Sequence, residues 1–173
     1  MEVRFLLAGP TYFRKHYMLR CYQMVGVPGS GKSTWIANQE WAKRCHIVST
    51  DYWVELEAAR LKKTYSEIFT EYMPKAVNLM AANVVAIREM GNDIIWDQTS
   101  TTIASRAKKF RMLPDYEHIA VVFKTPEHKE LVRRLSSRWE SGKIVPEHVV
   151  ASMIASWEDP TEEEGFKEIW YVD

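Results

Sequence analysis

The sequence contains little cysteine and little glycine, and it has no excess charge of either sign. Among its 173 residues only two are cysteines, Cys21 and Cys45, which is too few for a disulfide framework or a zinc site. None of the five histidines is spaced with another histidine or a cysteine as a pair of metal ligands would be. These shortages exclude small disulfide-stapled and zinc-organised domains, and we interpret both cysteines as buried thiols in a reducing compartment.

The charges balance, with 23 Lys+Arg against 23 Asp+Glu and a net charge of 0. A protein that coats long nucleic acid usually has a basic excess, so that class is disfavoured, although a small basic cleft for one end or one base stays open. No apolar run approaches the ~18 residues of a membrane span, so we expect no membrane partner. A hydrophobic content of 46% in 173 residues indicates one globular domain with a sizeable core.

We divide the chain into an N-terminal extension, residues 1–17, and one domain, residues 18–173. Met18 could be an internal start, and residues 3–7 could form an extra edge strand before the Gly9-Pro10 turn. We assign no chemistry to the extension.

Three of the seven glycines lie within residues 26–33, which match G-x-x-x-x-G-K-S. A strand-like run precedes this segment and a helical pattern follows it, as a phosphate-binding loop requires. Glycines let consecutive amides point at phosphate oxygens, the lysine reaches the β- and γ-phosphates, and the serine hydroxyl can ligate Mg²⁺. The predicted nucleotide contacts are Gly26, Pro28, Gly29, Ser30, Gly31, Lys32, Ser33 and Thr34. The alternative is an ordinary glycine-rich turn into a capped helix.

Apolar runs alternate with helical patterns along the domain, which predicts βαβ units and a parallel sheet. We expect strands near residues 19–25, 46–49, 93–97, 118–123 and 168–172. We expect helices near residues 32–44, 51–62, 66–90, 102–112, 127–139 and 146–157. Ligands of such sheets bind beyond the carboxyl ends of the strands.

The pattern of the long helix, residues 66–90, predicts a core stripe rather than a substrate groove. The stripe consists of Phe69, Met73, Val77, Met80, Val84 and Ile87. Pro74 should kink this helix or split it in two, because proline removes a backbone donor.

Two carboxylates follow predicted strands. Asp51 opens onto the γ-phosphate position and could accept the proton of an attacking hydroxyl, or it could belong to helix-capping chemistry, or both. Asp97 ends the third predicted strand and could hold Mg²⁺ directly, through water or by fixing a basic partner; the alternative is a helix-capping role. Gln98 stands where motor ATPases often carry a glutamate that activates water, which favours transfer to a hydroxyl over hydrolysis.

A basic helix at residues 130–138, a short turn and a second helix predict a lid over ATP. Arg134 and Arg138 lie one turn apart and could neutralise charge on the transferred phosphoryl group, unless this is only a solvated helix face. The densest basic patch, residues 106–111, could contact an acceptor phosphate or be a plain amphipathic helix. We expect the acidic stretch at residues 158–164 to be a solvated loop.

In this order, the motifs resemble the polynucleotide kinase branch of P-loop phosphotransferases. The resemblance covers residues 19–172 and rests on residues 26–35, Thr50-Asp51, residues 97–99, residues 104–106, residues 134–138, Val145-Pro146 and residues 160–166. It implies an α/β fold of the P-loop NTPase type, a three-layer sandwich whose five-stranded parallel sheet is flanked by helices, with a helical lid.

By this resemblance the substrates and cofactors are ATP, Mg²⁺ and a nucleic-acid hydroxyl. Lys32 and Ser33 would serve the phosphates and the metal, Asp51 would be the general base, and Arg138 the lid arginine. Asp97 would be the carboxylate that positions Arg138, and with Ser33 it forms the expected metal site. The implied location is the cytoplasm, the host's if a phage encodes the protein.

The chain departs from that pattern around the base. Thr50 replaces the usual arginine, and Trp53 and Val54 occupy the neighbourhood where phage members often carry another. The acceptor is therefore either a 5′-hydroxyl end or a hydroxymethyl group on a pyrimidine, whose flipped base would suit a pocket of Tyr52, Trp53 and Tyr65. Two further functions remain open: a nucleoside or sugar kinase, and a nucleotide-binding ATPase module. The oligomeric state is not determined by the sequence.

Overall fold

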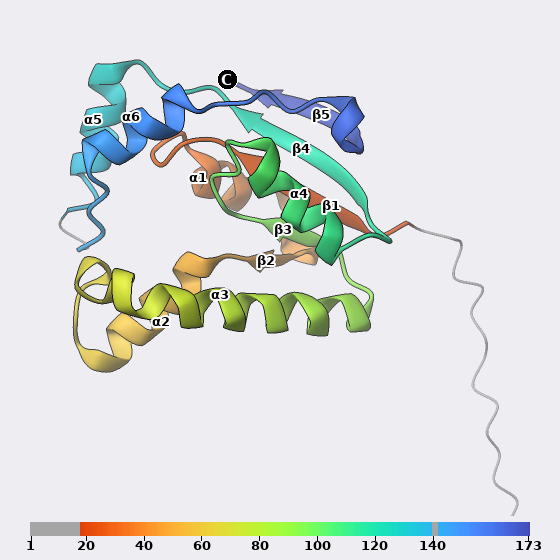
Figure 1. The fold of residues 1–173 in the computed structure, drawn as a ribbon, viewed down its shortest axis with the longest axis horizontal. Coiled ribbons are helices and arrows are strands. Elements are labelled where there is room, and N and C mark those ends of the chain that lie inside the picture. The colour runs from red at the N-terminus through yellow and green to blue at the C-terminus, as the bar shows by residue number, and fades with distance from the viewer. Residues whose placement is uncertain (1–17, 140–141) are drawn as a thin grey trace, which may run out of the picture.

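The computed structural model describes residues 18–139 and 142–173, and its centre is one parallel five-stranded sheet (Figure 1). The strands lie in the order β2-β3-β1-β4-β5. Their bounds are β1 Arg20–Val25, β2 His46–Val48, β3 Ile94–Trp96, β4 Glu117–Phe123 and β5 Phe166–Val172. The expected strand at residues 3–7 lies outside the described residues. The predicted α/β class with a five-stranded parallel sheet is confirmed.

The connections between the strands are helical. The α-helices are α1 Lys32–Ala37, α2 Thr50–Leu61, α3 Tyr65–Met90, α4 Ile103–Met112, α5 His128–Ser136 and α6 Glu147–Ala155. Two short 3₁₀ helices are η1 Glu40–Arg44 and η2 Glu162–Glu164. Every strand therefore runs in the same direction, and the carboxyl ends of all five strands meet at one edge of the sheet.

Helices cover both faces of the sheet, which gives three layers. On one face Ile36 of α1 and Ala42 of η1 join the alternate side chains of the strands. On the other face, side chains of α3 and the residue that ends α4 pack on three strands. The α3 residues are Met80, Val84 and Ile87, the C-cap of α4 is Leu113, and the strand residues are Cys21, Val48, Ile94 and Trp96. Since successive side chains of a strand point to opposite faces, strands β1, β3 and β4 are buried on both sides.

Two helices differ from their predicted form. The helix expected at residues 32–44 ends at Ala37, and the 3₁₀ turn η1 follows after Asn38 and Gln39. Pro74 does not split the long helix, because α3 runs without interruption from Tyr65 to Met90. Pro74 and Thr70 are exposed, so the Thr70 carbonyl that loses its helical partner can be hydrated.

The phosphate-binding loop follows β1 at the carboxyl edge of the sheet, and α5 and α6 lie at the same end (Figure 1). Val27 of the loop is fully buried against Leu131, Leu135 and Val150 of these two helices. The core therefore fixes the loop and the base of the lid relative to each other.

Candidate active site

A cavity of about 1090 Å³ opens at the carboxyl edge of the sheet. Its walls come from the phosphate-binding loop, the start of α2, the first half of α3, the end of β3, α4 and the segment between α5 and α6. This cleft therefore contains residues from both halves of the predicted site: the nucleotide side, with Lys32 and Ser33, and the acceptor side, with Asp51.

The loop has the backbone that its glycines predict. Gly29 and Gly31 have φ angles of 86° and 100°, in the left-handed region that disfavours a side chain. Lys32 Nζ donates hydrogen bonds of 2.8 Å to the Gly26 carbonyl and 2.9 Å to the Val27 carbonyl. The amine thus lies against the loop, in reach of anything the loop amides hold.

The electrostatics of Lys32 depend on its burial and on the charges around it. Burial lowers the pKa of Lys32 to about 8, although Asp97 and Asp51 act in the opposite direction, and Arg138 and Lys143 add to the lowering. A buried ammonium whose pKa is low becomes more strongly protonated when an anion arrives. A phosphate group bound in the loop would therefore provide the negative charge that stabilises the Lys32 ammonium.

Asp97 and Ser33 form the oxygen-donor pair expected for Mg²⁺. Ser33 Oγ donates a 3.2 Å hydrogen bond to Asp97 Oδ2, and burial raises the pKa of Asp97 against the lowering effects of Lys32 and Ser33. Among the described residues there is no group of three or more His, Cys, Asp or Glu that could hold a metal. One hydroxyl and one carboxylate fit magnesium, which binds a few protein oxygens and completes its shell with phosphate oxygens and water.

Asp51 is held by two side chains on the acceptor side of the cleft. Tyr65 Oη donates a 2.8 Å hydrogen bond to Asp51 Oδ1, and Lys143 Nζ donates one of 2.6 Å to Asp51 Oδ2. Lys143 also donates a 2.8 Å bond to Glu55 Oε1. Burial acts to lower the pKa of Lys143, but Asp51 and Glu55 outweigh it, so that pKa is raised. The N-cap of α2 is Ser49, whose Oγ accepts a hydrogen bond from the Asp51 amide. The Asp51 carboxylate therefore does not cap the helix.

Gly142 and Ile144, which lie between α5 and α6 in the chain, contact the start of α3. The Ser66 amide donates to the Gly142 carbonyl at 3.1 Å, and the Ile144 amide donates to Ser66 Oγ at 2.9 Å. Gly142 has φ 73°, and a Cβ there would lie 2.6 Å from Thr64 Cβ, so this contact needs glycine. The lid predicted from residues 130–146 therefore rests in contact with the acceptor side.

The two predicted lid arginines lie in different places. Arg138 lines the cleft, and its positive charge helps to lower the pKa of Lys32. Arg134 Nη1 donates a 3.2 Å bond to the Gly29 carbonyl, while its Nε bonds Glu130 at 2.6 Å. Arg134 thus reaches the loop backbone from α5 and does not line the cleft.

The predicted core stripe of the long helix divides between core and cleft. Val84 and Ile87 are core residues, and Met80 is both buried and part of the cleft wall. Phe69, Met73 and Val77 line the cleft, and the interpretation of the stripe as wholly core is wrong. The division depends on tertiary structure, since the first half of α3 extends past the end of β2 (Figure 1), and no described strand covers it there. Trp53 is also not where the sequence placed it: it packs into the core, while Tyr52 and Tyr65 line the cleft.

The basic patch at residues 106–111 is not one surface. Arg106 is fully buried and bonds Glu164 through Nε and Nη2, both at 2.8 Å, and its other contacts are carbonyls. Lys109 is 2% exposed, and both Lys109 and Lys108 line the cleft. The acidic stretch is likewise not a purely solvated loop, because Glu164 pairs with Arg106 and Glu158 Oε2 accepts the Ile103 amide at 2.7 Å.

A family model described as an AAA domain matches residues 22–160 of the chain. The chain belongs to this AAA-domain family. The match includes the phosphate-binding loop, Asp51, Asp97 and the lid, so it covers the whole cleft and supports a P-loop kinase-like fold with nucleotide binding.

Three solved structures show how widely this AAA-domain fold is shared. The first, a Chloroflexus aurantiacus J-10-fl protein whose assignment as a kinase is provisional, has TM-score 0.67 and 16% identity, over 90% of this chain and 85% of that one. A chain of the Pnkp1/Rnl/Hen1 RNA repair complex has TM-score 0.64 and 22% identity, over 83% and 45%. A gluconokinase from Sinorhizobium meliloti 1021 has TM-score 0.52 and 18% identity, over 90% and 83%. At these identities the likeness establishes the fold.

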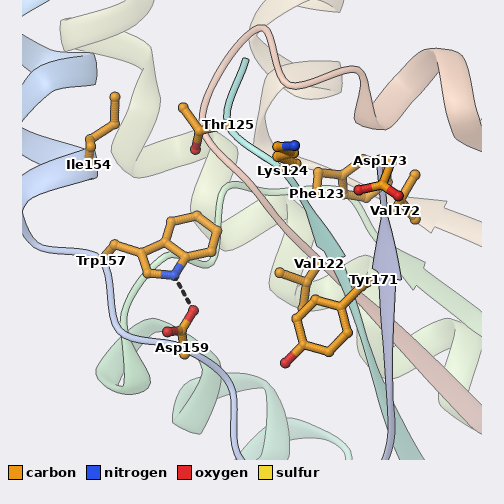
Figure 2. A pocket seen from close by; sticks show the side chains of 10 residues that line it. All are labelled: Val122, Phe123, Lys124, Thr125, Ile154, Trp157, Asp159, Tyr171, Val172 and Asp173. Atoms are coloured by element: carbon orange, nitrogen blue, oxygen red, sulfur yellow. Dashed lines mark hydrogen bonds between the residues drawn. The ribbon is translucent and has the colours of Figure 1, made fainter. Parts of the chain in front are cut away.

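A second cavity of the AAA domain, about 560 Å³, lies at the carboxyl ends of β4 and β5 (Figure 2). Trp157 and Tyr171 face it, and Trp157 Nε1 donates a 2.7 Å bond to Asp159 Oδ1. It contains no residue of the phosphate-binding loop and neither Asp51 nor Asp97. The larger cleft is therefore the candidate site, because shifted pKa values cluster there. No helix of the described part of the chain is long and apolar enough to span a membrane.

Most predicted site residues of the AAA domain lie at the cleft, whereas Arg134 and three others do not line it. Gly26 and Ser30 are buried residues of the loop itself, where a Cβ on Gly26 would lie 2.6 Å from Ser30 Oγ, and Thr34 is exposed on α1. The sequence assigned no role to Lys143, and it placed Lys109 only in the basic patch of residues 106–111. Lys143 is 92 residues from Asp51 in the chain, and no local sequence pattern predicts a contact over that separation.

Proposed function

We propose that this protein is an ATP-dependent kinase that transfers the γ-phosphoryl group to a hydroxyl on nucleic acid. The observation that carries the proposal is the shared cleft, in which the loop with Lys32 faces the carboxylate of Asp51. The acceptor hydroxyl oxygen attacks the γ-phosphorus, and the bond from that phosphorus to the β–γ bridging oxygen breaks. ADP leaves, and the hydroxyl proton passes to Asp51.

The chain's own residues supply positioning and charge. The loop amides and Lys32 hold the phosphates, Arg138 faces them from the lid, and Tyr65 orients Asp51. Ser33 and Asp97 would hold magnesium, which would supply positive charge to neutralise the phosphate oxygens. Transfer is favoured over hydrolysis because each end of the Gln98 amide already has a side-chain partner: it accepts a bond from Trp96 and donates one to Thr50.

The apolar wall supports a base as the group that carries the hydroxyl. Tyr52, Tyr65 and Phe69 provide aromatic surface on the acceptor side, which suits one unstacked base taken from a strand. The similarity to a chain of an RNA repair complex is consistent with this class of acceptor. The hydroxyl would belong to a 5′ end or to a hydroxymethyl group on a pyrimidine.

A small-molecule acceptor is the second candidate, and the docked lid favours it. The bonds from Ser66 to Gly142 and from Ile144 to Ser66 close one side of the cleft, which limits entry of a long strand. The gluconokinase with the same fold is consistent with a small alcohol.

Labelled ATP separates these candidates. The protein is incubated with γ-labelled ATP and 5′-hydroxyl oligonucleotides, hydroxymethylated DNA or free nucleosides, alongside the Asp51→Asn variant. Label on nucleic acid that Asp51→Asn abolishes is the expected result. Label on free nucleosides alone contradicts the nucleic-acid acceptor, and phosphate release without any labelled acceptor contradicts the kinase.

A further inference from the structure

Lys109 is a buried lysine at the wall of the cleft that the reaction above does not use. Its side chain is 2% exposed, and Nζ donates bonds of 2.9 Å to Ser100 Oγ and 3.2 Å to the Ser105 carbonyl. The ammonium also lies 5.5 Å from the centre of the Trp96 ring. Lys109, Ser100, Ser105 and Trp96 all line the cleft that contains Asp51.

The charge of Lys109 has no acidic counterpart in the described part of the chain. Arg106, one turn earlier on α4, is neutralised by Glu164 at 2.8 Å, whereas the charged neighbours that act on Lys109 are Arg106 and Lys108, both cations. Burial, followed by these two cations, lowers the pKa of Lys109 to about 8, and only Cys21 acts in the other direction. Burying an ammonium without a counter-charge destabilises a fold, so an apolar side chain would suit the fold better here.

The positions of the neighbouring residues indicate what the missing charge belongs to. Lys108 is exposed and lines the same wall, as do Ser100 and Ser105, so cations and hydroxyls are gathered there. Phe69, Met73 and Val77 provide apolar surface within the same cleft. An acceptor that satisfies both surfaces has a flat apolar part and an anionic part.

The geometry points to an anion subsite formed by Lys109, Lys108 and the Ser100 hydroxyl, which takes a phosphate group of the acceptor. This inference rests on the proposed function and specifies its substrate class. The acceptor is a nucleotide unit whose base lies on the apolar wall, whose phosphate lies at Lys109, and whose hydroxyl reaches Asp51. The phosphate is either a monoester of a free nucleotide or a diester within a strand.

Binding measurements test the subsite without requiring transfer. The protein is first saturated with Mg²⁺ and a non-hydrolysable ATP analogue, so that the loop cannot take the probe. Calorimetry then compares thymidine, thymidine 3′- and 5′-monophosphate, and the dinucleotide TpT. We expect at least one phosphorylated probe to bind about tenfold or more tightly than thymidine, as charge-assisted hydrogen bonds allow. A monophosphate preference indicates a free nucleotide, and a TpT preference indicates a strand.

Lys109→Met should remove most of that preference, Lys108→Met part of it, and Lys167→Met, an exposed change on β5, none. Because Lys109 is buried and no described carboxylate pairs with it, Lys109→Met should also leave the thermal unfolding midpoint unchanged or higher. Equal or undetectable binding of all probes overturns the subsite. So does a Lys109→Met variant that unfolds at lower temperature and keeps the preference. Failure of the analogue to bind at all contradicts the proposed function instead.

Discussion

Lys143 of the lid donates a 2.6 Å hydrogen bond to Asp51, the carboxylate proposed as the general base. Tyr65 holds the other oxygen of the same carboxylate at 2.8 Å, so both oxygens have a donor before any acceptor arrives. The acceptor hydroxyl must therefore share or displace the Lys143 bond. The base is oriented by α3 and covered by the lid.

Lys143→Met should raise acceptor-independent ATP hydrolysis by about tenfold, because one charge-assisted bond that shields the base from water, worth about 1.5 kcal/mol, is lost. The lid keeps its Ser66 contacts to Gly142 and Ile144 in this variant, so docking persists. Phosphate release without acceptor is the measurement. An unchanged or lower rate would contradict the shielding role.

Asp51→Asn should keep ATP affinity and reduce transfer by roughly 10²–10⁴, the usual contribution of a general base. Glu55→Gln is the matched control, since Glu55 is the other partner of Lys143 and has no role as a base. Single-turnover transfer and ATP titrations of both variants separate the effects. Loss of ATP affinity in Asp51→Asn would instead make Asp51 structural.

ATP affinity should fall as the pH rises above about 8, the pKa to which burial lowers Lys32. Below that pH the amine is already charged in the free protein. Above it, binding must also take up a proton, so Kd rises by up to about tenfold per pH unit. Calorimetry in buffers of different protonation enthalpy should show this uptake. Lys32→Arg, which does not titrate, should bind more weakly at every pH but without the proton uptake.

Arg138→Ala should slow transfer by up to about 10³–10⁵ if it acts as an arginine finger. Arg133→Ala is the control, because Arg133 is exposed on α5, pairs with Glu130 and does not line the cleft. Transfer rates and urea unfolding are compared for both. A destabilised Arg138→Ala variant with a normal rate would exclude the catalytic role.

Arg106→Met should lower the free energy of unfolding by about 3–5 kcal/mol, because it leaves Glu164, only 9% exposed, without its partner. Arg111→Met, an exposed change on the same helix, should have little effect. Urea denaturation of the two variants is the measurement. Equal stability would restore the interpretation of residues 106–111 as one surface patch.

The nucleotide side of the cleft could be predicted from the sequence because it depends on residues that are close together in the chain. The spacing of Gly26, Gly31, Lys32 and Ser33 carries the loop conformation within eight residues, because backbone freedom and side-chain reach are short-range properties. The alternation of apolar runs and helical patterns likewise predicted five parallel strands, which the structure confirms. The roles of Asp51 and Asp97 remain predictions that the experiments above test.

The acceptor side was decided only by tertiary structure. Phe69 and Val77 repeat at the same helical spacing as Val84 and Ile87, and only the edge of the sheet determines which pair is covered. Arg106 and Lys109 are near neighbours on one helix, yet one meets Glu164, and the other lines the cleft with no acidic partner among residues 18–139 and 142–173. Periodicity reports which side of a helix is apolar; what lies opposite that side depends on packing between distant segments.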